Sequence, residues 1–75
     1  MSPLPLNRVI TPEDVQERIE QIRAVARDDE TAHSNEDELH QGVLRAIAEG
    51  RAEDARLCAF IALSTREIEF CRRCA

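Results

Sequence analysis

The stretch from Ser34 to Gly50 constrains the fold more than any other part of this sequence. Its apolar residues are spaced by three or four positions, which places them on one face of an α-helix. Ser34 is a residue type that caps helix starts, and Asp37 three positions on completes a variant capping box. Gly50 is a residue type that ends helices. The pattern predicts a helix over 35–49 with a core stripe of Leu39, Val43, Ala46 and Ile47, which Leu44 widens.

Two further segments carry helical patterns. Thr11 followed by Pro12 and two acids is a strong helix start, and apolar residues then recur at helical spacing, so a helix over 12–27 is expected. The polar residues of this helix, Arg18 included, are expected to form a solvated surface. A helix over 52–64 is apolar nearly all round, which indicates burial from several sides. The motif S-T-R-E at Ser64 predicts that this helix ends or bends there and that a short helical turn follows.

The segments before and between these helices carry weaker sequence patterns. Residues 28–33 form a polar connection without Gly or Pro, and Thr31 is the alternative cap that would start the second helix earlier. Residues 1–10 contain two prolines, which favours an extended N-terminal arm over a helix. Leu4 and Leu6 make this arm too apolar for a solvated tail. It either lies across the bundle or forms an exposed docking strip.

The expected fold is therefore all-α. It is a small three-helix bundle in residues 11–75, with an extended arm over 1–10 and a short C-terminal helical turn. Seventy-five residues without Trp or Tyr and with only two Phe allow a thin aliphatic core. A homodimer is an open alternative, because a second subunit would supply the missing apolar contact.

Charge limits the classes of function. Fifteen acids against ten arginines give a net charge of −5, which disfavours non-specific binding to nucleic acids or membrane surfaces. No apolar run is long enough to span a bilayer, and the N-terminus lacks a signal-peptide pattern. The expected location is the cytoplasm, where cysteines are expected to be reduced.

Metal and enzyme chemistry are not expected. Cys71-x-x-Cys74 is a single C-x-x-C pattern, and the two histidines are seven residues apart, which is the wrong spacing for a zinc module. If a metal does bind, its ligands should be Cys71, Cys74 and His40. No Ser, Cys or His has the setting of an activated nucleophile, and no Gly-rich loop is present to hold phosphate. The chain is interpreted as a non-enzyme without cofactor.

Six carboxylates lie within eleven residues, between Asp28 and Glu38. The spacing of a calcium-binding loop is absent, because Ala32 and His33 occupy two of its required positions. The simplest interpretation is a set of helix-start acids and a solvated link. The alternative is a surface that mimics nucleic-acid phosphates and occupies the site of a nucleic-acid-binding protein.

Three segments resemble a group of small uncharacterised proteins from actinobacteria and their bacteriophages. They are A-H-S-N-E-D-E-L-H, V-L-R-A-I-A-E-G and A-L-S-T-R-E-I-E-F, and the resemblance covers Val15 to Ala75. The tail of the group resembles F-x-R-W-x-A, whereas this chain ends F-C-R-R-C-A with Arg73 in place of the aromatic residue. The resemblance implies a source and a fold and no chemistry.

The function expected from these features is a small acidic protein-interaction module, which the resemblance suggests is a phage-encoded modulator of a host protein. Its partner is expected to be a protein, with self-association as one form. The alternatives are the nucleic-acid mimic and a zinc module through Cys71 and Cys74. The expected interaction residues are Asp28, Asp29, Glu30, Glu36, Asp37, Leu4 and Leu6.

Overall fold

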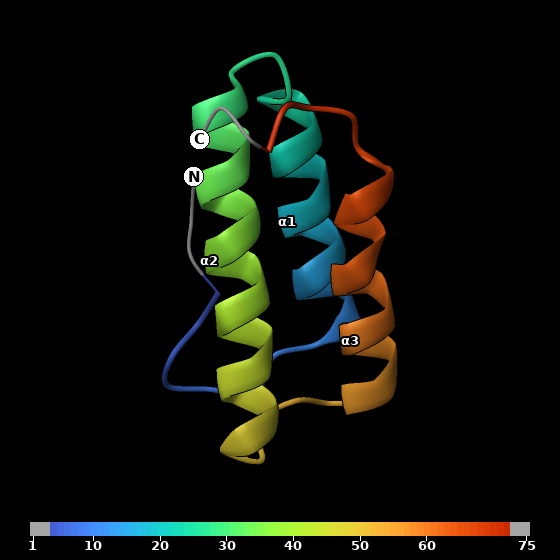
Figure 1. Ribbon diagram of the computed structural model, residues 1–75. Coiled ribbons are helices and arrows are strands. Elements are labelled where there is room, and N and C mark those ends of the chain that lie inside the picture. Colours follow the sequence, from blue (N-terminus) through green and yellow to red (C-terminus); the bar gives the residue numbers. More distant parts are fainter. Residues whose placement is uncertain (1–3, 73–75) are drawn as a thin grey trace.

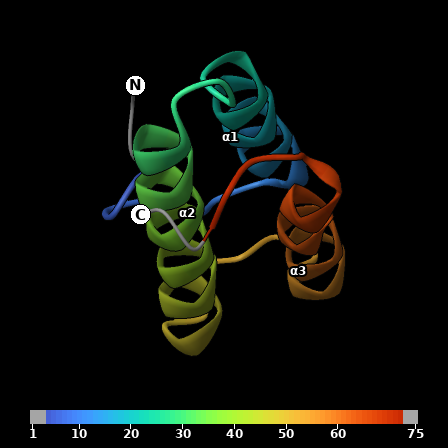
Figure 2. The ribbon, with the colours of Figure 1, turned by 45° about the horizontal axis from the view of Figure 1, so that its top comes forward.

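Three helices run up, down and up beside one another in the computed structural model, which describes residues 4–72 (Figure 1). They are α1 (Pro12–Ala24), α2 (Asp29–Ala48) and α3 (Ala55–Leu63), and the 3₁₀ turn η1 (Ser64–Glu67) follows α3 directly. Each helix contacts the other two, and the view along the bundle shows α1 and α3 on one side of the longer α2 (Figure 2). No strand occurs within residues 4–72. The predicted all-α three-helix bundle with a short C-terminal turn is confirmed.

The core is built from the predicted apolar stripes. Periodicity places one face of each helix toward the bundle axis, and burial there is what stabilises helices of this length. Ala26 and Ile47, the last members of two stripes, are only partly buried at the edge of this core. The buried apolar residues are Leu4, Ile10, Val15, Ile19, Ile22, Ala32, Leu39, Val43, Ala46, Cys58, Ala62 and Ile68.

The predicted start of α2 is wrong by six residues, because the helix begins at Asp29 and not at residue 35. Its cap is Asp28, whose carboxylate accepts hydrogen bonds from the backbone N–H of Thr31 at 3.1 Å and from the Thr31 hydroxyl at 2.8 Å. These bonds lower the pKa of Asp28. The start of α2 at Asp29 is favoured because the added first turn packs in the core, where Ala32 is fully buried. Ser34 lies inside the helix and is exposed.

Two alanine substitutions distinguish these caps. Asp28→Ala removes the acceptor for Thr31 and is expected to lower the melting temperature by roughly a few degrees. Ser34→Ala, on the exposed surface of α2, is the matched control and is expected to change the unfolding free energy by no more than about 0.5 kcal/mol. Thermal and urea unfolding followed by circular dichroism measures both. A larger loss for Ser34→Ala would contradict the observed helix start.

The other two helices are shorter than predicted. α1 ends at Ala24, where the N–H of Val25 bonds to the carbonyl of Ile22 in a tighter turn. α3 starts at residue 55 because Asp54, in the left-handed conformation with φ of 52°, caps it by accepting from the N–H of Leu57 at 3.2 Å. The predicted cap at Ser64 does not form, since the Ser64 hydroxyl donates to the carbonyl of Ile61 instead.

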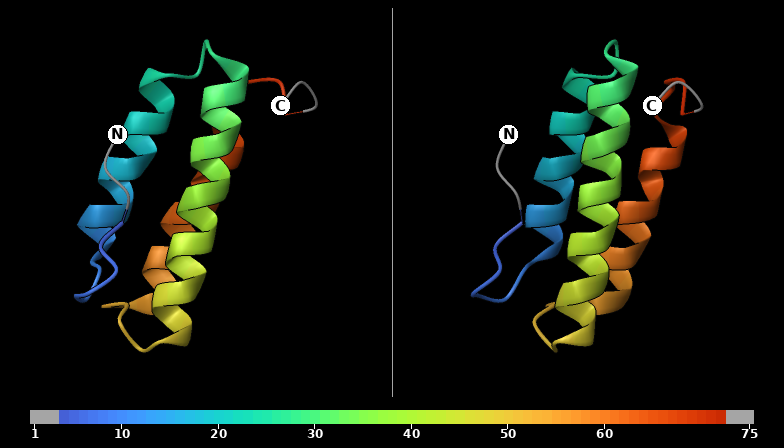
Figure 3. Two further views of the ribbon diagram at one scale, coloured as in Figure 1. Left: turned by 90° about the vertical axis from the view of Figure 1, so that its left-hand side faces the viewer. Right: turned by 60° about the vertical axis from the view of Figure 1, so that its left-hand side comes forward.

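Residues 4–10 are not helical and run along the lower half of α1 and α2 (Figure 3). Leu4 is buried over Gly42, where a Cβ atom would lie 3.0 Å from Leu4 Cδ1, so the missing side chain makes room for the contact. Leu6 and Val9 are exposed. The two interpretations of this segment, packing across the bundle and exposure to solvent, therefore apply to different residues. Leu4 packs on the bundle, whereas Leu6 faces solvent.

Ile10 joins the N-terminal segment to the link between α2 and α3. Its N–H donates to the carbonyl of Arg51 at 2.7 Å, and its own carbonyl accepts from the N–H of Glu53 at 2.9 Å. These bonds form an isolated parallel bridge between Ile10 and Ala52. The Arg51 guanidinium adds bonds to the carbonyls of Pro5 and Arg8. The bridge holds Ala52 outside a helix and Glu53 follows in a turn, so α3 starts after both residues.

Candidate functional site

Exposed large hydrophobic side chains gather on α2 and α3. Phe60 is 72% exposed, Leu44 66% and Leu63 63%, and Leu57 is also exposed. α3 is apolar nearly all round, but a three-helix bundle covers only its inner side, where Cys58 and Ala62 are buried. Ile61 packs against the core, whereas Leu57, Phe60 and Leu63 point outward. The prediction that Leu44 widens the core stripe of α2 is wrong, because the bundle leaves that side of α2 uncovered. We call Leu44, Leu57, Phe60, Leu63 and the hollow between the two helices the apolar face.

The hollow of the apolar face has a volume of about 270 Å³. Small side chains on α3 leave this space open, because Ala59 and Ala62 cannot reach across to α2. Leu44 from α2 and Leu63 from α3 also line it. Its complete lining is His40, Val43, Leu44, Ala59, Ala62 and Leu63. A surface of this composition offers almost only carbon to a ligand.

His40 is the polar residue in this lining, and its ring nitrogen is engaged inside the bundle. Nε2 lies 3.1 Å from the carbonyl of Ala62 and 3.0 Å from the hydroxyl oxygen of Thr65. Because a carbonyl oxygen only accepts, Nε2 must carry the hydrogen. Thr65 is fully buried, so its hydroxyl is out of reach of a substrate despite lying beside a histidine. The pair holds η1 against α2 and does not form a catalytic dyad.

The buried Glu36 carboxylate and the partly exposed Arg72 form an ion pair that fixes the segment after η1 onto α2. Arg72 Nε donates to Glu36 Oε1 at 3.0 Å and Arg72 Nη2 donates to Oε2 at 2.9 Å, which is the two-pronged geometry of strong pairs. The same Nη2 also donates to the carbonyl of Thr65, and the guanidinium lies over the Phe70 ring. Glu36 is 2% exposed. We call Glu36, His40, Thr65 and Arg72 the C-terminal clamp.

Electrostatics in the C-terminal clamp favour the ionised carboxylate. Burial alone raises the pKa of Glu36, but hydrogen bonds from Arg72 and Thr65 and the positive charge of Arg72 outweigh it, so the pKa of Glu36 is lowered. The same pairing raises the pKa of Arg72. Sequence analysis missed this clamp, because it placed Glu36 among solvated helix-start acids. The seven-residue spacing of Asp29 and Glu36 places both on one helix face, and this pattern could have indicated that they share a covering segment.

The predicted acidic interaction residues do not form one surface. Asp29 and Glu36 lie on the face of α2 that the C-terminal segment covers, and Asp29 accepts from the N–H of Cys71 at 2.9 Å. Glu30 and Asp37 lie on the next face and are exposed, with Asp37 3.5 Å from His33. Asp28 is the helix cap described above. The carboxylates exposed to a partner are therefore Asp28, Glu30 and Asp37 within this set.

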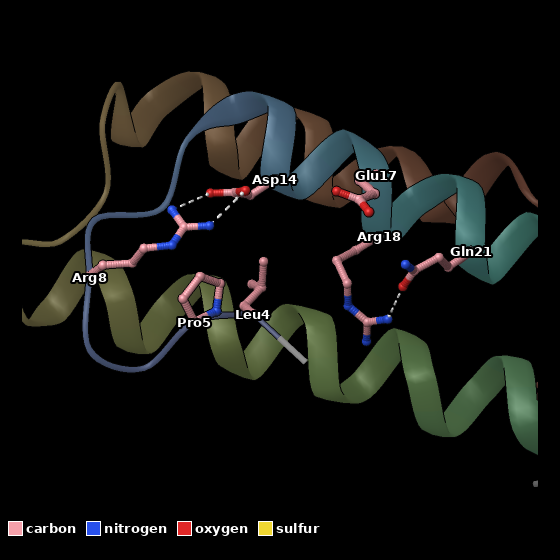
Figure 4. A pocket seen from close by; sticks show the side chains of 7 residues that line it. All are labelled: Leu4, Pro5, Arg8, Asp14, Glu17, Arg18 and Gln21. Atoms are coloured by element: carbon pink, nitrogen blue, oxygen red, sulfur yellow. Dashed lines mark hydrogen bonds and ion pairs between the residues drawn. The ribbon is translucent and has the colours of Figure 1, made fainter. Parts of the chain in front are cut away.

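A second hollow, of about 210 Å³, lies between the N-terminal segment and α1 (Figure 4). Arg8 and Asp14 pair across it at 3.3 Å. Arg18 was predicted to be solvated, but it is 3% exposed; it reaches toward α2, donates to Gln21 at 2.7 Å and lies 3.6 Å from Glu38. Its long aliphatic stem makes this burial feasible. Burial lowers the pKa of Arg18, and Arg18 Nε has no hydrogen-bond partner among residues 4–72.

Of the three residues named for a metal site, the structure describes Cys71 and His40. Cys71 is disulfide-bonded, so its sulfur is committed and the expectation of reduced cysteines is wrong at this position. Cys74 lies outside the described residues. Cys58 is a free, buried thiol whose Sγ donates to the carbonyl of Glu53, and burial raises its pKa. Within residues 4–72 no group of three or more His, Cys, Asp or Glu side chains is placed to hold a metal ion.

The fold and this surface define a small three-helix bundle with an uncovered apolar face. No helix in the described part of the chain has the length and apolar character to cross a membrane. No family model, curated protein or solved structure matches the chain. The surface itself is therefore the guide to function.

Proposed function

We propose that this protein is a protein-interaction module that binds its partner through the apolar face. The supporting observation is Phe60, a large aromatic side chain 72% exposed beside an apolar hollow. Removing such a side chain from water contributes roughly 1.5–3 kcal/mol, and aromatic residues next to pockets are the usual energetic centres of protein interfaces. Leu44 and Leu63 on either side extend the surface that a partner would cover.

The resemblance to actinobacterial and phage proteins suggests the setting of this interaction. We propose a modulator that acts by occupying a surface of a host protein. Such a role needs shape and apolar contact and requires no catalytic group. It also fits the acidic net charge of −5, which disfavours non-specific nucleic-acid contacts.

Affinity capture tests this proposal. The immobilised protein is incubated with an actinobacterial lysate beside a Phe60→Ser/Leu63→Ser variant, and captured proteins are identified by mass spectrometry. Both side chains are mostly exposed, so the variant should stay folded, which circular dichroism checks. A partner lost by this variant and retained by Val9→Ser, at an exposed apolar residue of the N-terminal segment, is the expected result. Equal capture by all three proteins would reject the apolar face.

A second variant separates docking from phosphate mimicry. Glu30→Lys/Asp37→Lys reverses two exposed acids, whereas reversing Asp29 or Glu36 would break the contacts that hold the C-terminal segment. Docking through the apolar face should survive this change. Loss of all partners in Glu30→Lys/Asp37→Lys, with retention in Phe60→Ser/Leu63→Ser, would favour the nucleic-acid-mimic alternative instead.

A further inference from the structure

We infer that the hollow between the N-terminal segment and α1 binds a small zwitterion of the amino-acid class, which carries one carboxylate and one ammonium group. We call this space, which lies between residues 4–8 and residues 14–21, the Arg18 hollow. It shares no lining residue with the apolar face, so the inference is independent of the proposed function. Two side chains of α1 carry it: Arg18, whose Nε lacks an acceptor, and Glu17, whose carboxylate lacks a partner.

Arg18 presents an unused pair of hydrogen-bond donors. Its side chain is only 4% exposed, yet Nε makes no hydrogen bond within residues 4–72. Nη1 donates to Gln21 at 2.7 Å, whereas Nη2 lies 3.6 Å from Glu38, which is too long for a hydrogen bond. Figure 4 shows Nη1 on the side of Gln21 and Nε on the side of Leu4, which also lines the hollow. A buried donor without an acceptor is unfavourable, so this edge of the guanidinium favours an acceptor from outside the chain.

Arg72 shows which acceptor fits the Nε–Nη2 edge of an arginine in this protein. Its Nε and Nη2 donate to the two carboxylate oxygens of Glu36, at 3.0 and 2.9 Å. A carboxylate on a ligand matches the same edge of Arg18 in shape and in number of acceptors. Glu38 does not fill this edge, because its carboxylate is 54% exposed and approaches Nη2 alone.

The charges around the Arg18 hollow disfavour a simple anion. Arg8 and Asp14 pair with each other at 3.3 Å, and Glu38 offsets the charge of Arg18. Glu17 also lines the hollow and has no hydrogen bond or ion pair within the described chain. A ligand carboxylate alone would be repelled by Glu17, whereas an ammonium group on the same ligand gives Glu17 a partner. An occupant with both charges therefore satisfies both unused groups.

The size of the Arg18 hollow limits the occupant to a small molecule. Its volume of about 210 Å³ is below the roughly 300–1,000 Å³ of pockets that hold drug-sized ligands. Leu4 and Pro5 form an apolar wall, which suits an aliphatic amino acid. Because Nε is enclosed, the carboxylate reaches it when the N-terminal segment shifts. This movement and the small contact area lead us to expect a dissociation constant on the order of 1 mM.

Nuclear magnetic resonance of the arginine Nε–H groups tests this binding directly. The isotope-labelled protein is titrated with L-alanine to about 50 mM, which saturates a site of millimolar affinity. The Nε–H signal of Arg18, assigned through its side-chain connectivities, is expected to shift and to saturate. Arg18→Met keeps a long apolar side chain and removes the donors, so it should lose binding. An Arg18 signal that does not respond to L-alanine overturns the inference, since water or Glu38 then fills the edge.

Two probes that each carry half of the zwitterion test the need for both charges. Propionate has the carboxylate without the ammonium group, and ethylammonium has the ammonium group without the carboxylate. Each should bind at least about threefold more weakly than L-alanine, because each leaves Arg18 or Glu17 without its partner. Propionate that binds as tightly as L-alanine would show an anion site and overturn the zwitterion.

A matched pair of variants tests the role of Glu17. Glu17→Gln should weaken L-alanine binding about threefold and should not weaken propionate binding. Glu13→Gln makes the same charge change at an exposed position of α1 outside the hollow, and it should bind both probes as the parent does. Both acids are exposed, so these variants should stay folded even if Arg18→Met does not. Glu17→Gln that binds L-alanine as tightly as the parent would rule out the ammonium contact and, with it, the inferred ligand.

Discussion

Leu39→Asp is expected to unfold this protein, whereas Leu44→Asp on the same helix is expected to leave it folded. Leu39 is 1% exposed in the core, and a carboxylate there would be buried without a partner. Replacing a buried leucine by a smaller residue alone costs about 2–5 kcal/mol, and the charge adds to this. The sum approaches the whole stability of a domain this small.

Far-ultraviolet circular dichroism with urea unfolding measures this pair of variants. Loss of the helical signal in Leu39→Asp, with a normal unfolding transition in Leu44→Asp, is the expected result. Leu44 is 66% exposed, so the introduced charge remains in water. A folded Leu39→Asp variant would contradict the bundle packing. Unfolding of both variants would contradict the exposure of the apolar face.

Arg72→Ala is expected to destabilise the protein by roughly 2–4 kcal/mol, because it leaves the buried Glu36 carboxylate without its partner. Glu36→Gln should cost less, since the amide still fills the site and Arg72 is partly exposed to water. Arg66→Ala, at an exposed position, is the control and should change stability by no more than about 0.5 kcal/mol. Urea unfolding of the three variants measures this order. Equal losses at Arg72 and Arg66 would show that the ion pair is not a stabilising contact.

The same carboxylate predicts a pH dependence. The folded-state pKa of Glu36 is lowered from its ordinary value of 4.5, so its stabilising contribution is fully present above that value. It is lost progressively as the pH falls through the lowered pKa. The parent should therefore lose stability in acid more steeply than Glu36→Gln, which cannot titrate there. Parallel unfolding slopes for the two proteins between about pH 5 and pH 2 would contradict this assignment.

The apolar pattern predicted the fold because it reports directly on burial. The stripes led by Val15 in α1 and Leu39 in α2 are buried as expected, and these alone imply a helical bundle. The start of α2 was harder to predict, because Asp28, Thr31 and Ser34 are all acceptable caps by residue type. The choice depends on whether Ala32 gains from packing against the core, which is a tertiary effect.

The candidate site was predictable only in part. An α3 helix that is apolar nearly all round indicated more surface than three helices can bury, but which residues point outward depends on how the helix is turned in the bundle. The burial of Arg18 and Glu36 could not be read from their neighbours, since each relies on a contact distant in sequence. Glu36 meets Arg72 across 36 residues of chain. Periodicity describes one helix and gives no information about such partners.

The bridge at Ile10 and the ion pair at Arg72 together tie the chain into two overlapping loops. One loop is closed between Ile10 and Ala52, and the other between Glu36 and Arg72. The two share the residues from Glu36 to Ala52, which include more than half of α2. Closing loops of this length costs only slightly more entropy than closing shorter ones, because the cost grows with the logarithm of length. Because both loops run through this part of α2, residues 4–10 and 68–72 are expected to come free together with the core when it melts.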